Sequence, residues 1–225
     1  MWNTIIITPL ATLLHFFFTA TGDIGLAIIC FTVFVKVLLF PLNISSAKTS
    51  KGMKLVQGQV DKLREKHKGS PQVLGAELSK LYKENNIKPF AGILNLFIQL
   101  PILLGLYQIV IKELKILTDT TTFFALEIAK PSIFLAILAF ASMYVLMHFS
   151  TKDLAPAADM KDGFQKDFAK MMAIQMKYFM PILILVTSTF LPAGIVIYII
   201  TANVFGIFQT LLIKKITDKH FAKSA

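Results

Sequence analysis

The sequence predicts an all-α membrane protein with five transmembrane helices, a cytoplasmic antiparallel helical hairpin and an N-terminal helix in the membrane interface. Of the 225 residues, 55% are hydrophobic and only 16% are charged, which is the wrong balance for a surface in water. Long stretches without a formal charge recur along the chain, and the charges gather in the segments between them.

Residues 1 to 22 form the first uncharged stretch, and we expect them to lie in the interface as an amphipathic helix. Pro9, His15 and several threonines make the stretch a poor membrane span, and it lacks the basic start of a signal peptide. A sixth span remains the alternative. In both interpretations the next helix begins on the outer side of the membrane.

The core, residues 23 to 214, is predicted to hold the five spans. Three stretches are long enough to cross roughly 30 Å of hydrocarbon at about 1.5 Å per residue. These stretches are residues 24 to 43, 90 to 111 and 131 to 149.

The last uncharged stretch, residues 178 to 213, would make a helix of roughly 54 Å, which is too long for one span. Pro192 and Gly194 lie in its middle and predict a helix-breaking turn. We therefore expect two short spans, at about residues 173 to 191 and 193 to 213.

The charge of the loops predicts the orientation. Residues 44 to 89 carry ten basic side chains and four acidic ones, whereas residues 112 to 130 carry three of each. Because cytoplasmic loops are enriched in Lys and Arg, the first of these loops is placed in the cytoplasm. Five spans then put the loop of residues 150 to 177 and the basic tail, residues 215 to 225, on the cytoplasmic side too.

Residues 46 to 86 show a helical period on both sides of the Gly69-Ser70-Pro71 turn. The apolar residues that repeat are Val56, Val60, Leu63, Leu74, Leu78 and Leu81. This pattern predicts an antiparallel helical hairpin. Two roles stay open: a solvated basic pair of helices that follows from membrane topology alone, or a docking surface for partners or acidic lipid headgroups.

Lys36 is a charged residue near the middle of the predicted span 24 to 43. A cation at such a depth costs about 2.5 to 3.5 kcal/mol on insertion scales. Snorkelling is the simple alternative, but it must cover roughly 10 Å along the helix axis. None of the 13 acidic residues lies in a predicted span, so the sequence favours a hydrated groove that opens to the cytoplasm and receives polar or acidic groups.

Other polar residues in the predicted spans are candidates to line the same groove. Thr32 precedes Lys36 by four residues and shares its helix face. The remaining candidates are Gln99, Ser142, Tyr198 and Asn203. Taken singly, each is better explained by an interhelical hydrogen bond, and it is their number, together with Lys36, that favours the groove.

The sequence gives no reason to expect a cofactor, a metal or an enzyme. Cys30 is the single cysteine, and the four histidines are scattered without ligand spacing. No pair of carboxylates lies in a span, and no Gly-x-Ser-x-Gly motif occurs. The net charge of +10 belongs to the loops, so sequence-specific binding of nucleic acid is not expected. A small anion transporter or channel with Lys36 as its anion site stays the alternative function.

Several motifs resemble the core of YidC/Oxa-type membrane protein insertases. Residues 31 to 42 place a threonine four residues before a basic residue and end in Pro-Leu, like the first core span of that family. Further resemblances are Lys88-Pro89-Phe90-Ala91-Gly92, Phe97-Ile98-Gln99-Leu100-Pro101-Ile102, Met180-Pro181, Leu191-Pro192-Ala193-Gly194, Ile197-Tyr198 and Ala202-Asn203. The resemblance covers about residues 5 to 214, in order.

The resemblance implies an insertase and chaperone of the bacterial plasma membrane that inserts and helps fold nascent membrane proteins. Lys36 would be the groove cation, Thr32 and Tyr198 would face the substrate, and Gln99 would belong to the groove wall. Bacterial members usually carry Arg at the position of Lys36, and lysine lacks the bidentate fork of arginine. The implied partners are nascent membrane proteins and the bilayer, with the ribosome, the Sec translocon and the signal recognition particle receptor as further candidates.

Overall fold

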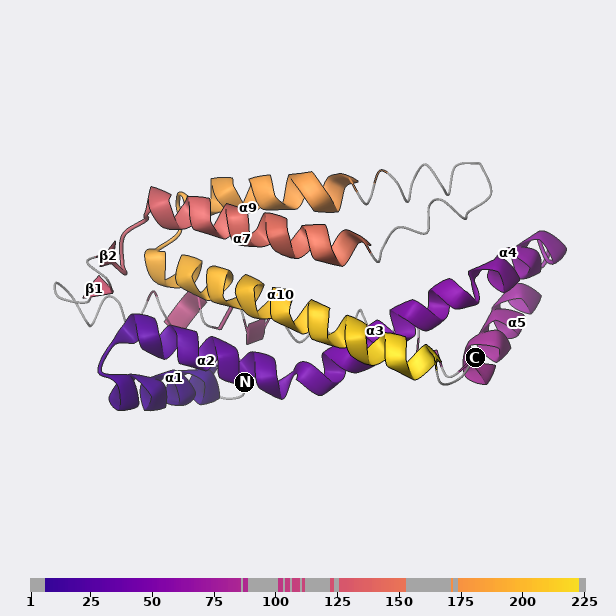
Figure 1. The fold of residues 1–225 in the computed structure, drawn as a ribbon, viewed down its shortest axis with the longest axis horizontal. Helices are drawn as coiled ribbons and strands as arrows, with labels where there is room; N and C mark the ends of the chain where they lie inside the picture. Colours follow the sequence, from indigo (N-terminus) through magenta and orange to yellow (C-terminus); the bar gives the residue numbers. More distant parts are fainter. Residues whose placement is uncertain are drawn as a thin grey trace. The chain divides into compact units, whose positions relative to one another are not determined.

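The computed structural model describes part of the chain, which forms two compact units (Figure 1). The described residues are 7–85, 87–88, 101–102, 104–105, 107–109, 111, 122–123, 126–152, 171 and 174–222. We call Met1–Leu38 with Leu100–Leu211 the core unit, and Leu39–Gln99 with Leu212–Ala225 the hairpin unit. Most of the predicted span 90 to 111, including Gln99, lies outside the described residues.

The core unit begins with two helices that pack against one another, α1 (Thr8–Thr21) and α2 (Ile24–Leu38). Gly22 joins them with a φ of 69°, and its N–H donates to the Phe18 carbonyl at 2.8 Å. A glycine adopts this left-handed conformation without strain, which explains why α1 ends there. The placement of α1 in the membrane interface stays a prediction.

The predicted span 24 to 43 is not one continuous helix. A turn at Leu39 separates α2 from α3 (Phe40–Leu55). Pro41 explains the break, because proline has no N–H for the preceding turn and its ring clashes with the carbonyl four residues earlier. The resemblance implied that Pro41 and Leu42 close the span, which was predicted to end at residue 43, whereas the structure places Pro41 in the first turn of the next helix, where proline is tolerated.

Helix α7 (Ile133–Lys152) packs along a composite helix made of the π-helical turn η2 (Gln175–Phe179) and α9 (Met180–Ser188). Figure 1 shows α7 and α9 side by side. The π-helical turn lies directly before Pro181, which cannot donate to the carbonyl of Lys177 one turn earlier. We attribute the widened turn to this missing donor.

Residues 189 to 192 separate α9 from the long helix α10 (Ala193–Ala222), where Pro192 and Gly194 predicted a break. The first N–H groups of a helix have no acceptor within it. Here the Ala193 N–H donates to the Lys130 carbonyl at 3.0 Å, and the Gly194 N–H donates to the Ile128 carbonyl at 3.1 Å. The segment before α7 therefore caps α10.

A short antiparallel β-hairpin, which the sequence did not predict, precedes this capping segment. It pairs β1 (Thr122–Phe123) with β2 (Leu126–Glu127). All the longer elements among the described residues are helices, in agreement with the predicted all-α class. Strands of two residues are too short to show an alternating pattern in a sequence.

Two of the described helices are long and apolar enough to cross a membrane, over Ile133–Ser150 and Ala193–Asp218. Helices α2 and α3 would add a third crossing if they count as one bent span, and Lys177–Ser188 is apolar but shorter. Helix α10 also continues beyond the predicted end of its span at residue 213. The count of five spans stays a prediction.

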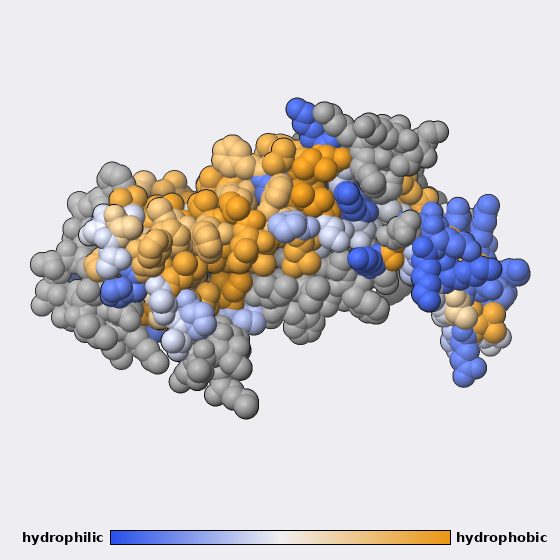
Figure 2. All heavy atoms as spheres, turned by 90° about the horizontal axis from the view of Figure 1, so that it is seen from below, coloured by the Kyte–Doolittle hydropathy of each residue, from blue (hydrophilic) through white to orange (hydrophobic). Residues whose placement is uncertain are grey.

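The hairpin unit holds α3, α4 (Gln57–Lys66), α5 (Pro71–Glu84) and the end of α10. Early residues of α4 meet late residues of α5, so the two helices run antiparallel. Their core consists of Val56, Val60, Leu81 and Ile87, flanked by Met53, Leu63, Leu78 and Tyr82. Figure 2 shows the charged side chains of this hairpin in blue around a small apolar patch.

Candidate functional site

The groove cation predicted from the sequence lies at the border of the packed face of α2. Ala27, Ile28 and Phe31 on that face are completely buried. Thr32 is 1% exposed, and its Oγ1 donates to the Ile28 carbonyl at 2.6 Å. Lys36, one turn further along, is half-buried. The Thr32 hydroxyl therefore forms its hydrogen bond within α2, and Lys36 is the more accessible residue of the two.

The position of Lys36 around the helix axis explains its intermediate burial. At about 100° per residue, Lys36 lies between buried Thr32 and exposed Val33. Val37, on the far side, is 56% exposed, as expected of a side chain that meets lipid. The Lys36 side chain therefore leaves α2 at the edge of its packed face and not on its apolar outer face.

Ser142 of α7 and Asn203 of α10 hydrogen-bond to one another. The Asn203 Nδ2 donates to the Ser142 Oγ at 3.1 Å, and this hydroxyl donates to the Ala139 carbonyl at 2.9 Å. Next to this pair, Gly206 lets Leu146 approach so closely that an added Cβ would lie 3.2 Å from the Leu146 Cδ1. Small residues and interhelical hydrogen bonds are the usual means of joining helices in lipid. Both groove candidates therefore link α7 to α10 in this structure.

Tyr198 lies on another side of α10. It is 4% exposed and five residues before Asn203, so the two side chains leave the helix about 140° apart. Gln99, the remaining groove candidate, lies outside the described residues. The structure thus separates the candidates into Lys36 and Thr32 on α2, the Ser142–Asn203 link, and Tyr198.

Two polar residues of the core unit were missed by the sequence analysis. Among the described residues, Ser188 Oγ and Gln209 Nε2 are the buried side-chain atoms without a hydrogen-bond partner. Ser188 ends α9, and Gln209 lies in the apolar stretch of α10, where it is 9% exposed. The criterion that selected Asn203, a polar side chain within a predicted span, would also have selected Gln209.

The hairpin unit carries a pocket of about 340 Å³ between α4 and α5. Leu63 and Leu81 contribute its apolar part. Its charged lining residues are Lys62, Lys66, Glu77, Lys80 and Glu84. The two charged residues from α4 are lysines, and α5 adds two glutamates and one lysine, so the lining carries charges of both signs.

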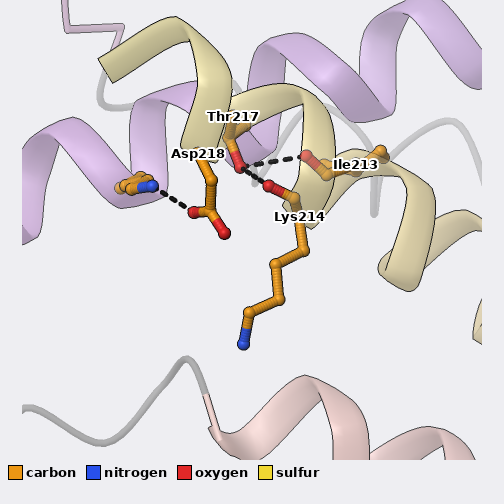
Figure 3. Close-up of polar contacts among 5 residues, drawn as sticks. Ile213, Lys214, Thr217 and Asp218 are labelled. Atoms are coloured by element: carbon orange, nitrogen blue, oxygen red, sulfur yellow. Dashed lines mark hydrogen bonds and ion pairs between the residues drawn. The ribbon is translucent and has the colours of Figure 1, made fainter. Parts of the chain in front are cut away.

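The end of α10 is held to α3 by an ion pair between Asp218 and Lys51 (Figure 3). Next to it, Thr217 is 4% exposed and its Oγ1 donates to the carbonyls of Ile213 and Lys214, at 2.9 and 3.0 Å. Thr49 of α3 is buried as well. Within the part of the chain that the structure describes, no cluster of His, Cys, Asp or Glu is suited to bind a metal.

Comparisons with known proteins agree with the motifs. The family model described as 60Kd inner membrane protein matches residues 16–220. The membrane protein insertase YidC of Clostridium tetani is 36% identical over 198 residues, which make up 88% of this chain and 84% of that protein. The YidC insertase of Oceanobacillus iheyensis is 32% identical over 220 residues, or 96% of this chain and 84% of that protein.

The fold is shared with a solved structure. A crystal structure described as an active YidC insertase with its first transmembrane domain resolved has a TM-score of 0.63 at 23% identity. The likeness covers 92% of this chain and 46% of the crystallised one, so this chain spans just under half of that protein. The relatives are named as insertases and not as enzymes. This chain belongs to the YidC/Oxa-type family of membrane protein insertases.

Proposed function

We propose that this chain is a membrane protein insertase and chaperone of the bacterial plasma membrane, which passes polar segments of nascent membrane proteins through a groove open to the cytoplasm. The observation that carries the proposal is the half-buried Lys36, set in the apolar helix α2 beside its packed face. Membership of the insertase family supports the same function.

The physical argument starts from the cost of a cation at membrane depth. An ammonium group there needs water or polar neighbours, because lipid offers neither. A hydrated groove supplies Lys36 with water and polar neighbours. It also lowers the free-energy barrier to crossing the membrane for any polar segment that enters it. An acidic or polar N-terminal tail of a substrate is attracted to the cation, whereas a basic tail is repelled.

The apolar segment of the substrate takes a different route. Helices α7 and α9 expose large apolar side chains, among them Ile137, Leu138, Ile182 and Val186, which are 40 to 55% exposed. Figure 2, which views the molecule from below, shows that apolar side chains, in orange, also cover much of this side of the core unit. A substrate helix can slide along these side chains into lipid while its polar tail crosses beside Lys36. The step needs no nucleotide, since partition of the apolar segment supplies the free energy.

The proposed topology places the helical hairpin and the C-terminal end of α10 in the cytoplasm. The excess of basic residues in the hairpin suits an acidic partner or anionic headgroups. Nascent chains are the proposed substrates. The ribosome, the Sec translocon and the signal recognition particle receptor are candidate partners for this basic surface.

Rescue of a bacterium depleted of its own insertase tests the proposal. We expect this chain and its Lys36→Arg variant to restore growth and the insertion of a single-span substrate with an acidic tail. Lys36→Glu should fail, whereas Lys130→Glu serves as the matched control and should rescue, because this side chain is 71% exposed and belongs neither to the hairpin nor to the groove candidates. Anion flux through liposomes that hold the purified chain, without insertion of the substrate, would instead support a transporter with Lys36 as its anion site.

A further inference from the structure

Gln209 of α10 carries a buried side-chain amide. Its side chain is 9% exposed, and its Nε2 has no hydrogen-bond partner among the described residues. An unpaired amide donor in apolar surroundings is costly, and native proteins keep few of them. Ser188 shares this property, but a hydroxyl at the end of a helix can rotate towards a carbonyl of its own turn. Gln209 instead lies in the interior of α10, where the carbonyls of the preceding turn already accept backbone N–H groups.

The position of Gln209 relates it to Tyr198 and not to the Ser142–Asn203 link. Gln209 follows Tyr198 by eleven residues, which is three turns, so both side chains leave the same face of α10 about 16 Å apart along the axis. It follows Asn203 by six residues and therefore points about 120° away from the hydrogen bond to α7. Five residues later, Lys214 begins the charged end of the helix.

The chemistry of a primary amide fits one class of ligand, the peptide group of an extended chain. The amide offers two N–H donors and one carbonyl acceptor and carries no charge. A polar segment that crosses a membrane without helical structure has backbone N–H and C=O groups that lack partners. A neutral amide can pair with these groups whatever the charge of the side chains they carry.

We propose that Gln209 is a further substrate-binding residue, which hydrogen-bonds the main chain of the polar segment near the cytoplasmic end of its path. The inference rests on the proposed function and extends it along α10. Because the Nε2 atom is shielded in this structure, contact requires the covering side chains to separate. The hydrogen bonds to the substrate then offset the unpaired donor of the substrate-free state.

Insertion into liposomes by the purified full chain tests this role with two tails of equal length, one acidic and one neutral. Gln209→Leu should slow both tails by a similar factor of about five, the worth of one net hydrogen bond. Lys36→Ala should slow the acidic tail alone. Thr210→Val, which changes a half-buried neighbour on another side of α10, is the control and should leave both rates unchanged.

Thermal unfolding separates binding from a structural role. Removal of an unpaired buried amide should leave the stability of Gln209→Leu unchanged or raise it. A disulfide cross-link between Gln209→Cys, in a Cys30→Ala background, and a cysteine in the substrate tail should report direct contact. Slower insertion that follows a loss of stability, without a cross-link, would overturn the inference.

The outcomes distinguish the two proposals. Wild-type rates for Gln209→Leu with both tails, while Lys36→Ala still slows the acidic tail, would overturn the role of Gln209 and leave the insertase function standing. A wild-type chain that inserts neither tail would overturn both.

Discussion

The two units of the molecule arrange polarity in opposite ways. In the core unit, large apolar side chains such as Phe134 and Phe208 are 63 and 68% exposed, while the polar Asn203 is 8% exposed. In the hairpin unit, Val60 and Leu81 form the interior, and charged residues cover the surface. Apolar side chains thus lie on the outside of the core unit, as suits lipid, and on the inside of the hairpin unit, as suits water.

The difference shows which interactions hold each unit together. Apolar burial gives no net gain between helices in lipid, so the core unit depends on close packing, as at Gly206, and on hydrogen bonds such as Ser142–Asn203. In water, burial of apolar area is the main driving force, and the small core of α4 and α5 provides it. The same kind of substitution should therefore have very different costs in the two units.

A matched pair of substitutions gives the largest expected contrast. Leu138 of α7 and Val73 of α5 are 40 and 45% exposed, so both offer room for a new side chain. Leu138→Lys should cost about 2.5 to 3.5 kcal/mol, because it puts a cation towards the middle of a membrane span. Val73→Lys should cost less than about 0.5 kcal/mol, because the site faces water. Membrane-inserted yield and unfolding in nanodiscs measure both, and equal costs would refute the contrast.

Truncation of the hairpin core comes next. Leu81→Ala removes a residue at the centre of the contact between α4 and α5 and should destabilise the hairpin by about 2 kcal/mol, the low end for such a change in a small core. Hydrogen exchange of the amides of α4 and α5 should speed up accordingly. Leu74→Ala, half-buried and outside this core, is the control, and a larger effect there would mean that the core has been placed wrongly.

The link between α7 and α10 should give a smaller effect. A double-mutant cycle with Ser142→Ala and Asn203→Ala should yield a coupling free energy of about 0.6 kcal/mol, the average for hydrogen bonds between helices in membranes. Reversible unfolding in mixed micelles measures it. A coupling near zero would show that close packing alone joins these helices.

The Lys51–Asp218 ion pair should give the smallest effect. Both side chains reach water, with exposures of 32 and 56%, so the gain is screened. The coupling from Lys51→Ala and Asp218→Ala should be smaller than that of Ser142–Asn203 and should fade in high salt, while the charge swap Lys51→Asp with Asp218→Lys should restore it. A coupling that salt does not change would mean that the pair is shielded from water.

Charge spacing predicted more of the fold than of the site. The uncharged stretch around Ile133–Ser150 and the break before Ala193 were predicted, because charge and proline act locally. The end of α10 was not, because Lys214 and Lys215 indicated the end of a span, whereas the helix continues to Ala222 with Thr217 buried. Charged residues end a span but do not end a helix.

Residue roles in the site depend on contacts that spacing does not encode. Ser142 and Asn203 are 61 positions apart, and only the packing of α7 on α10 brings them together. Thr32 shares a helix face with Lys36, as predicted, but its hydroxyl is used within α2. Gln209 carries the same sequence signal as Asn203, a polar side chain within a predicted span, but only the structure shows that its buried donor has no partner among the described residues.

The most direct test of the central claim, that Lys36 acts on the polar segment of a substrate, crosses variants of Lys36 with substrate tails of different charge in liposomes. The account predicts that Lys36→Glu slows insertion of an acidic tail by about tenfold or more, equal to about 1.4 kcal/mol, and that a basic tail reverses the loss. Lys36→Arg should behave like the wild type. Equal rates for every variant with every tail would show that Lys36 only snorkels to the headgroups and would contradict the mechanism.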